Sequence, residues 1–178
     1  MSRVFGLAAT SLFAGLSVGS SYLLGIRFEW AVAIQVFVTL VIAAVGEHRV
    51  SGEGYYQYKE LNGVFLGNVP VWIPFMWVFV CQTCLIISLV VGFQSLAAAI
   101  CAGITGLVID LIVIEPILSR GPYALWHWSP VTDGYFSFLP SHLNRFAAPF
   151  GNYIVWFFFP FLMSLLLGFL NTLRTFAL

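Results

Sequence analysis

Charged residues are scarce in this 178-residue chain. Only 8% of its residues are Asp, Glu, Lys or Arg, and seven basic residues balance seven acidic ones. Ordinary soluble domains carry roughly 25% charged residues, so this chain has too little charge to cover a surface that faces water. It also has no basic stretch that could neutralise the phosphates of a nucleic acid. The composition therefore excludes a soluble domain, an acidic disordered tail and a nucleic-acid-binding protein.

Several motifs of common enzymes and transporters are also missing. The sequence contains no G-x-x-x-x-G-K-[ST], no G-x-G-x-x-G and no H-E-x-x-H, so nucleotide-driven transport, Rossmann cofactor binding and zincin proteolysis have no support. The Cys81-x-x-Cys84 spacing lies inside an apolar run, where packing is expected rather than redox chemistry. The three histidines stand far apart in the sequence, so we predict no metal site and no cofactor.

Long uncharged runs divide the chain. They cover residues 4–26, 30–46, 61–109 and 146–173. A membrane helix needs about 20 apolar residues, so the third run has room for two helices, separated near residues 92–95.

Five transmembrane helices are therefore predicted. Their expected ranges are 4–26, 30–46, 71–92, 95–117 and 152–173, and the second is the shortest. Uncharged runs of this length are typical of helices, whereas membrane barrels show segments of about ten alternating residues. The predicted fold is an all-α polytopic helix bundle, with residues 1–178 forming one transmembrane domain.

The basic residues predict an orientation. With five spans, five basic residues fall on the side of the N-terminus and two on the other side: Arg3, Arg49, Lys59, Arg120 and Arg145 against Arg27 and Arg174. Basic residues accumulate in cytoplasmic loops. We therefore expect an integral protein of the cell membrane, with a cytoplasmic N-terminus and the loops 47–70 and 118–151 on the cytoplasmic side.

Two acidic residues stand at the end of the fourth predicted span. A carboxyl group inside a membrane helix is costly and suggests a functional site. Gly103, Gly106 and Asp110 share one helix face, so Asp110 should face the interior of the bundle. Glu115 lies about 140° further round an ideal helix, so it meets Asp110 only if Pro116 distorts the helix.

Glu47 ends the second predicted span on the same side of the membrane. It is either a functional carboxyl group or an ordinary helix end paired with Arg49. The segments 54–58 and 118–151 are rich in aromatic residues and too apolar to extend into water. We expect them to lie among the lipid headgroups or to fold back over the bundle.

Three blocks of sequence together suggest a family. The first consists of Glu47, Gly52, Tyr56, Tyr58 and residues 67–77; the second of Asp110, Glu115-Pro116 and residues 126–128; the third of residues 149–156. Their order and spacing resemble those of the membrane carotenoid-biosynthesis proteins, which include carotenoid 1,2-hydratases and bisanhydrobacterioruberin hydratases. The chain looks like a short member of that family.

This resemblance implies a function. A hydratase of this kind adds water to a terminal C=C bond of a carotenoid or another long isoprenoid, by acid catalysis and without a cofactor. The catalytic candidates are Asp110, Glu115 and Glu47. The residues implied to line or orient the substrate site are Tyr56, Tyr58, Trp77, Trp126, Trp128, Asn152 and Trp156. The implied partners are membrane lipid and the isoprenoid itself.

Two alternatives remain open from the sequence. The chain could be a non-catalytic subunit that binds pigment or lipid, within a larger membrane complex or a homo-oligomer. It could also be a small proton-coupled carrier with Asp110 as the relay. A carrier needs a polar path to the opposite side, where the predicted spans have few polar residues.

Overall fold

The computed structural model describes residues 2–120, 124–129 and 148–176. Five helical spans in this part of the chain are long and apolar enough to cross a membrane, which confirms the predicted all-α bundle. They are α1 (Ser2–Phe28), α2 (Trp30–Gly52), α3 (Trp72–Val90), α4 (Ser95–Ile109) with its continuation, and α6 (Phe150–Phe176). The continuation of α4 is a π-helical turn, η2 (Asp110–Ile114), followed by α5 (Glu115–Leu118).

The prediction that the second span is the shortest is wrong. Helix α2 runs past Glu47 to Gly52 and has 23 residues, whereas α3 has 19. The polar residues from Glu47 onward do not end α2, because their side chains form hydrogen bonds or ion pairs in the folded protein. Arg49 and Glu53 pair across one helical turn, with Nε of Arg49 2.9 Å from Oε1 of Glu53.

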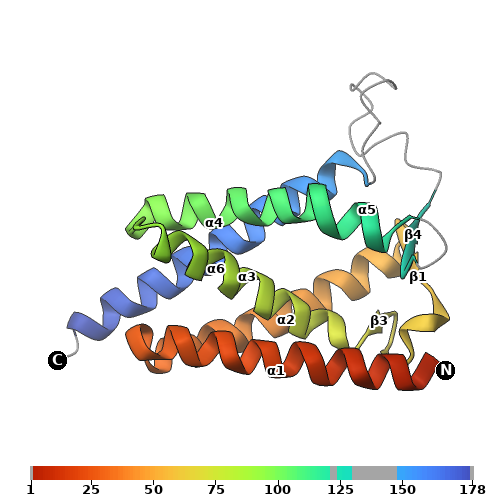
Figure 1. The fold of residues 1–178 in the computed structure, drawn as a ribbon, viewed down its shortest axis with the longest axis horizontal. Helices are drawn as coiled ribbons and strands as arrows, with labels where there is room; N and C mark the ends of the chain where they lie inside the picture. The colour runs from red at the N-terminus through yellow and green to blue at the C-terminus, as the bar shows by residue number, and fades with distance from the viewer. Residues whose placement is uncertain (1, 121–123, 130–147, 177–178) are drawn as a thin grey trace.

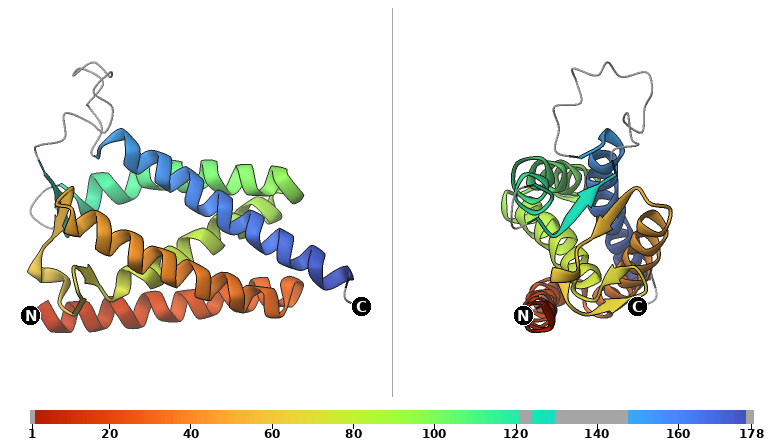
Figure 2. Two further views of the ribbon diagram at one scale, coloured as in Figure 1. Left: turned by 180° about the vertical axis from the view of Figure 1, so that it is seen from behind. Right: turned by 90° about the vertical axis from the view of Figure 1, so that its right-hand side faces the viewer.

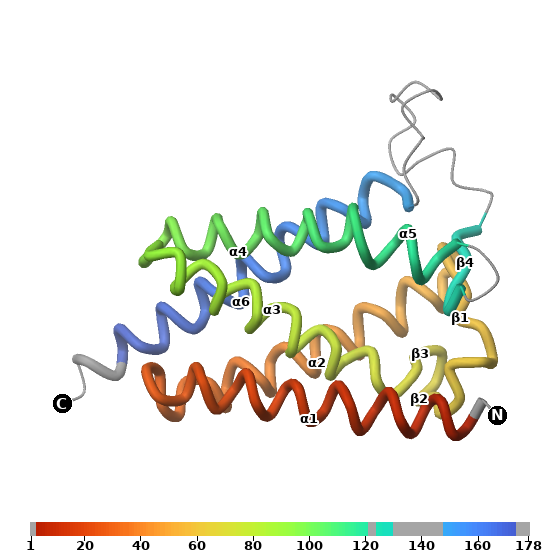
Figure 3. The backbone as a smooth tube through the Cα atoms, in the orientation of Figure 1, coloured from red at the N-terminus to blue at the C-terminus, as the bar shows by residue number. Residues whose placement is uncertain are grey.

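Consecutive spans run in opposite directions, so the connecting segments gather at the two ends of the bundle (Figure 1). The N-terminus lies at the same end as β1 (Tyr56–Tyr58), η1 (Glu60–Asn62), β2 (Phe65–Leu66), β3 (Val69–Pro70) and β4 (Trp126–Trp128). The C-terminal end of α6 lies at the opposite end, as the tube in Figure 3 also shows. The described parts of the aromatic segments therefore lie at one end of the bundle.

Two short antiparallel ribbons close this end of the bundle. Strand β1 pairs with β4, which places Tyr56 opposite Trp128 and Tyr58 opposite Trp126. Strands β2 and β3 form a separate hairpin. Figure 2 shows the β1–β4 ribbon across the end of the helices, so the described parts of the aromatic segments do fold back over the bundle.

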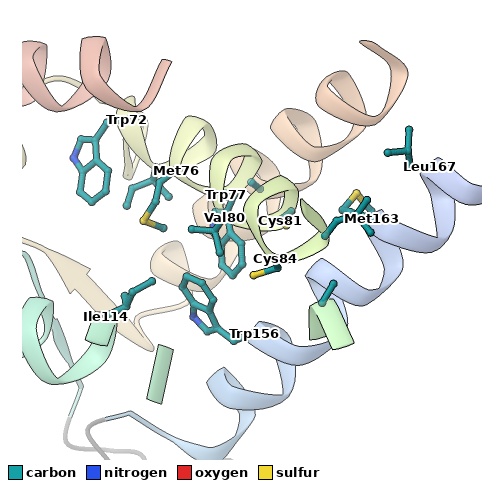
Figure 4. Close-up of a cluster of buried hydrophobic side chains, with 14 of the residues drawn as sticks. Trp72, Met76, Trp77, Val80, Cys81, Cys84, Ile114, Trp156, Met163 and Leu167 are labelled. Atoms are coloured by element: carbon teal, nitrogen blue, oxygen red, sulfur yellow. The ribbon is translucent and has the colours of Figure 1, made fainter. Parts of the chain in front are cut away.

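Small residues let α4 approach α6 closely. A Cβ atom on Gly106 would lie 2.6 Å from the carbonyl oxygen of Trp156, and one on Gly103 would lie 2.8 Å from that of Phe157. As predicted, Asp110 continues this buried face and is fully buried. The interior beyond it is mainly apolar and aromatic (Figure 4), with the rings of Trp77 and Trp156 4.2 Å apart between centroids.

A hydrogen-bonded network of uncharged side chains joins four helices inside the bundle. The amide of Gln82 donates to Oε1 of Gln35 at 3.1 Å, and the hydroxyl of Ser20 donates to Oε1 of Gln82 at 2.6 Å. Gln35 in turn donates to the carbonyl oxygen of Met163 at 3.2 Å. Hydrogen bonds of this kind hold membrane helices together where apolar burial provides no driving force.

Candidate functional site

Glu47 accepts hydrogen bonds from three aromatic side chains. Its Oε1 accepts from Nε1 of Trp77 at 2.7 Å, and its Oε2 accepts from the hydroxyls of Tyr58, at 2.8 Å, and Tyr56. Both oxygens of the carboxyl group are thus occupied by donors, an arrangement that stabilises a carboxylate. Glu47 is not paired with Arg49, whose partner is Glu53.

The local structure explains how two tyrosines reach one carboxyl group. Tyr56 and Tyr58 are two residues apart on β1, so their side chains leave the strand on the same side. Burial, followed by the negative charge of Glu47, raises the pKa of the Tyr58 hydroxyl well above its ordinary value. Tyr58 therefore remains a hydrogen-bond donor to Glu47 even in alkaline solution.

Asp110 and Glu115 are brought together by the π-helical turn. The backbone N–H of Glu115 donates to the carbonyl oxygen of Asp110, which is the i to i+5 bond of a π-helix. A π-helical turn holds more residues than an α-helical turn, so Asp110 and Glu115 do not lie about 140° apart around the helix as they would in an ideal α-helix. As a result, Nδ2 of Asn152 reaches both acids, at 2.8 Å from Oδ2 of Asp110 and 3.2 Å from Oε1 of Glu115. The distortion that the sequence left open is present, immediately before Pro116.

Glu115 has a second donor in the aromatic ribbon. Nε1 of Trp128 lies 2.9 Å from Oε2 of Glu115. Trp128 also packs edge-on against Tyr56, with ring centroids 4.9 Å apart. The β1–β4 pairing therefore places two donors of Glu47, Tyr56 and Tyr58, and one donor of Glu115, Trp128, on one ribbon, which links the two carboxyl groups.

A small cavity of about 40 Å³ lies between these groups. It is lined by Glu47, Tyr56, Tyr58, Ile73, Met76, Trp77, Glu115, Trp126, Trp128, Asn152 and Trp156. Every predicted site residue except Asp110 is in this lining. Asp110 lies behind Asn152, and its Oδ1 has no hydrogen-bond partner in the described part of the chain. The catalytic and binding roles of these residues remain predictions.

A larger apolar cavity of about 520 Å³ adjoins the small one. It runs between α2 and α6, and we call it the α2–α6 groove. Five residues line both spaces: Glu47, Tyr56, Trp77, Trp128 and Asn152. The volume is within the range of about 300–1,000 Å³ that is usual for small-molecule sites. A lipid-like molecule in the groove would thus touch the wall of the polar cavity.

Comparison with known proteins identifies the family. Residues 1–175 match a family described as "Carotenoid biosynthesis protein". This chain belongs to the carotenoid biosynthesis protein family. The searches of curated proteins and of solved structures gave no match. The predicted resemblance is confirmed and extends beyond residues 47–156 to nearly the whole chain.

Membership of the carotenoid biosynthesis family fits the five apolar spans. The protein is an integral membrane protein of a family described by its part in carotenoid biosynthesis. The site agrees with that setting, because its larger space is apolar and lies within the spans. Ile73 and Met76, which the sequence did not mark as site residues, also lie in the wall of the small cavity. Their spacing from Trp77 on one face of α3 was the available signal.

The remaining candidates of the sequence lie away from the site or outside the described residues. Nδ1 of His48 accepts a hydrogen bond from the backbone of Asn68 at 3.3 Å, and Cys81 and Cys84 are buried in α3. His142, one of the three histidines, lies outside the described residues. Across residues 2–120, 124–129 and 148–176, no three His, Cys, Asp or Glu side chains are grouped as metal ligands.

One further motif is present in this family member. Residues 15–19 read G-x-S-x-G, the spacing of a hydrolase nucleophile, which requires a sharp turn between a strand and a helix. Here the motif lies in the middle of α1, and the hydroxyl of Ser17 donates to the carbonyl oxygen of Phe75 at 2.8 Å. Ser17 therefore joins α1 to α3 and is not placed as a nucleophile.

Proposed function

We propose that this protein is a cofactor-independent hydratase that adds water to a terminal C=C bond of a long isoprenoid such as a carotenoid. One observation carries the proposal. A small cavity with two carboxyl groups, Glu47 and Glu115, adjoins an apolar groove of about 520 Å³. A cavity of about 40 Å³ is large enough for a water molecule that has polar partners. The two reactants of a hydration thus have adjoining spaces.

The arrangement of acids supports one proton donor and one anion. Two carboxyl groups, Glu47 and Glu115, line the small cavity, and Asp110 lies behind Asn152. No Lys, Arg or His among the described residues lines either cavity. Like charges so close together, in apolar surroundings, favour retention of a proton. Glu47 accepts three hydrogen bonds and is assigned the anionic role. Glu115 faces the small cavity and accepts two hydrogen bonds, from Trp128 and Asn152, instead of three, so it is assigned the role of proton donor.

The reaction then follows from these positions. Glu115 transfers its proton to the less substituted carbon of the terminal C=C bond, and a tertiary carbocation forms at the other carbon. The negative charge of Glu47 and the faces of Trp77 and Trp128 stabilise that cation. Water in the small cavity attacks it, and its surplus proton passes to Glu47. Return of this proton to Glu115 completes the cycle, with H and OH added across the bond.

Asp110 has a positioning role in this proposal. It touches neither cavity, but it accepts a hydrogen bond from Asn152, which also contacts Glu115. Replacing Asp110 with Asn is expected to let Asn152 shift and to misplace Glu115. A misplacement of about 1 Å can reduce turnover by around a hundredfold. The expected signature is a lower kcat with a nearly unchanged KM, together with an altered pH profile of kcat.

The test is a hydration assay with purified protein in lipid nanodiscs, using the acyclic carotenoid lycopene and ¹⁸O-labelled water. The expected product carries one labelled hydroxyl per hydrated end. Glu115→Gln keeps the shape of the side chain but removes the acid, and it should reduce turnover by about 10²–10⁴-fold. Circular dichroism and thermal unfolding show whether the variant is folded.

The result also separates the alternatives. Lycopene bound at stoichiometric amounts without any product would favour a pigment-binding subunit. Full turnover by Glu115→Gln would contradict the assignment of Glu115 as the proton donor. Proton flux across proteoliposomes that depends on Asp110 would favour the carrier. Against a carrier, the described network beyond the site consists of Gln and Ser side chains without an acid.

A further inference from the structure

We infer that the α2–α6 groove takes one end of a long isoprenoid chain sideways from the bilayer, so that the chain end, and not its interior, reaches the carboxyl groups. The role given to the carboxyl groups rests on the proposed function. The proposed binding of the isoprenoid chain is supported by the shape and lining of the groove, and it can be tested separately from the reaction.

The groove opens from the bundle toward the hydrocarbon of the membrane. Apart from its polar end it is lined by apolar residues of two membrane-spanning helices. The residues on its edges are about half exposed: Ile42 48%, Val155 51%, Phe158 49% and Leu162 49%. An opening within spanning segments faces lipid and not water, so its occupant must be a molecule dissolved in the bilayer.

Small side chains on α2 create the space. Ala43 and Gly46 are three residues apart, so they lie on one face of the helix and both line the groove. A Cβ atom on Gly46 would have no neighbour within 4 Å. Position 46 therefore borders open space, which a larger side chain would fill without displacing the backbone.

The two ends of the groove differ. At one end, the hydrogen bond from Gln35 to the carbonyl oxygen of Met163, at 3.2 Å, joins α2 directly to α6 just beyond Leu162. At the other end lie Glu47 and Asn152. The groove thus leads from the interior of the membrane to the carboxyl groups.

The length of the groove indicates how much of a chain it can hold. It follows α6 from Gly151 to Leu162, which is about 16 Å at 1.5 Å per residue. This is about half of the ~30 Å hydrocarbon core. The remainder of a long isoprenoid must stay in the lipid outside.

The polar end of the groove is too confined for a chain to pass through. The space beyond it is the cavity of about 40 Å³, whose wall includes the rings of Trp77 and Trp156, with centroids 4.2 Å apart. An internal C=C bond could reach the carboxyl groups only if the chain continued past them. The groove therefore selects chain ends.

The test compares two glycine substitutions of equal size. Gly46→Phe fills the groove, whereas Gly168→Phe adds the same side chain to α6 outside the groove, where a Cβ also has no neighbour within 4 Å. Lycopene retained per protein is measured after reconstitution in nanodiscs and removal of free pigment. Losing contact with even one buried isoprene unit should weaken binding about tenfold or more. Gly168→Phe should bind like the unchanged protein.

Chain-end selection has a separate readout. β-Carotene, in which both ends are closed into rings, should displace bound lycopene poorly, whereas an excess of an acyclic carotenoid should displace it fully. Equal displacement by β-carotene would overturn entry by the chain end. Normal lycopene binding by Gly46→Phe would overturn the groove as the binding site. The proposal would also be overturned if Gly46→Phe lost only a bound phospholipid and still bound lycopene.

The two proposals can fail independently. If lycopene binds and Gly46→Phe abolishes its binding, but no hydrated product forms, the groove assignment stands and the hydratase proposal fails. If product forms equally well in the unchanged protein and in Gly46→Phe, the hydratase proposal stands and the groove assignment fails. Glu115→Gln should retain lycopene while losing turnover.

Discussion

The side-chain amide of Asn152 donates to Oδ2 of Asp110 at 2.8 Å. This contact joins the first turn of α6 to the π-helical turn η2, across 42 residues of sequence. It is the only described hydrogen bond to the carboxyl group of Asp110, whose other oxygen is buried without a partner among the described residues. The stability of this end of the bundle should therefore depend on the pair.

Asn152→Ala should lower the free energy of unfolding by about 1–3 kcal/mol, because it leaves a buried carboxyl group without its donor. The measurement is denaturant unfolding in detergent micelles. A double-mutant cycle with Asp110→Ala should give a coupling energy of about 0.5–3 kcal/mol. Additive effects of the two substitutions would show that the contact does not contribute.

Gly106→Ala should destabilise the bundle by about 1–3 kcal/mol through overpacking. The added Cβ would lie 2.6 Å from the carbonyl oxygen of Trp156, so α4 and α6 must move apart. Gly168→Ala is the matched control on α6, because a Cβ there has no neighbour within 4 Å. Thermal unfolding of both variants tests this, and equal melting temperatures would contradict the close approach of the helices.

Tyr58→Phe should change the pH dependence of stability. Burial and the charge of Glu47 raise the pKa of Tyr58 in the folded state, so the folded protein keeps a proton that the unfolded chain loses near pH 10. The stability linked to Tyr58 is fully present below about pH 10 and is lost as the pH rises through the folded-state pKa. The decline in unfolding free energy above about pH 10 should be smaller in Tyr58→Phe.

The same substitution should cost about 1–3 kcal/mol at neutral pH, because Glu47 loses one donor. Tyr22→Phe serves as the control, since Tyr22 is 72% exposed on α1. Unfolding free energies measured from neutral to alkaline pH separate the two effects. Identical alkaline curves for Tyr58→Phe and the unchanged protein would contradict the assignment.

The cytoplasmic location of the N-terminus remains a prediction from the basic residues. Alkaline phosphatase, which is active only outside the cytoplasm, should be inactive when fused after Gly54 and active when fused after Gly92. These glycines lie at opposite ends of the bundle, after α2 and after α3. Fusions of green fluorescent protein at the same points should fluoresce in the inverse pattern. The reverse result for both reporters would invert the orientation.

Much of the lining of the small cavity could be predicted from the sequence. Tyr56, Trp77, Trp128 and Asn152 were grouped through a family resemblance, and the structure brings them into the wall of one cavity with Glu47. The resemblance was needed, because these residues come from five separate elements. Periodicity describes each element by itself and carries no information on how distant elements pack.

Some features depended on contacts that local patterns do not encode. The second span was expected to end before Glu47, but donors from β1 and α3 allow the helix to continue. The partner of Arg49 is Glu53 and not Glu47. The donors that engage Glu47 approach it only in the folded bundle, whereas the Arg49–Glu53 pair is a local contact across one turn.

The sequence by itself determined that this protein has five spans long and apolar enough to cross a membrane, with Glu47, Asp110 and Glu115 at one end. The spans can be predicted from uncharged runs, because each membrane-spanning helix must itself be long and apolar enough to cross the hydrocarbon core. Only the tertiary structure decided that Glu115 faces the small cavity while Asp110 lies behind Asn152. That choice arises from the π-helical turn and from the packing of α6 on Gly103 and Gly106, where the carboxyl groups take the positions in which donors from other helices can reach them.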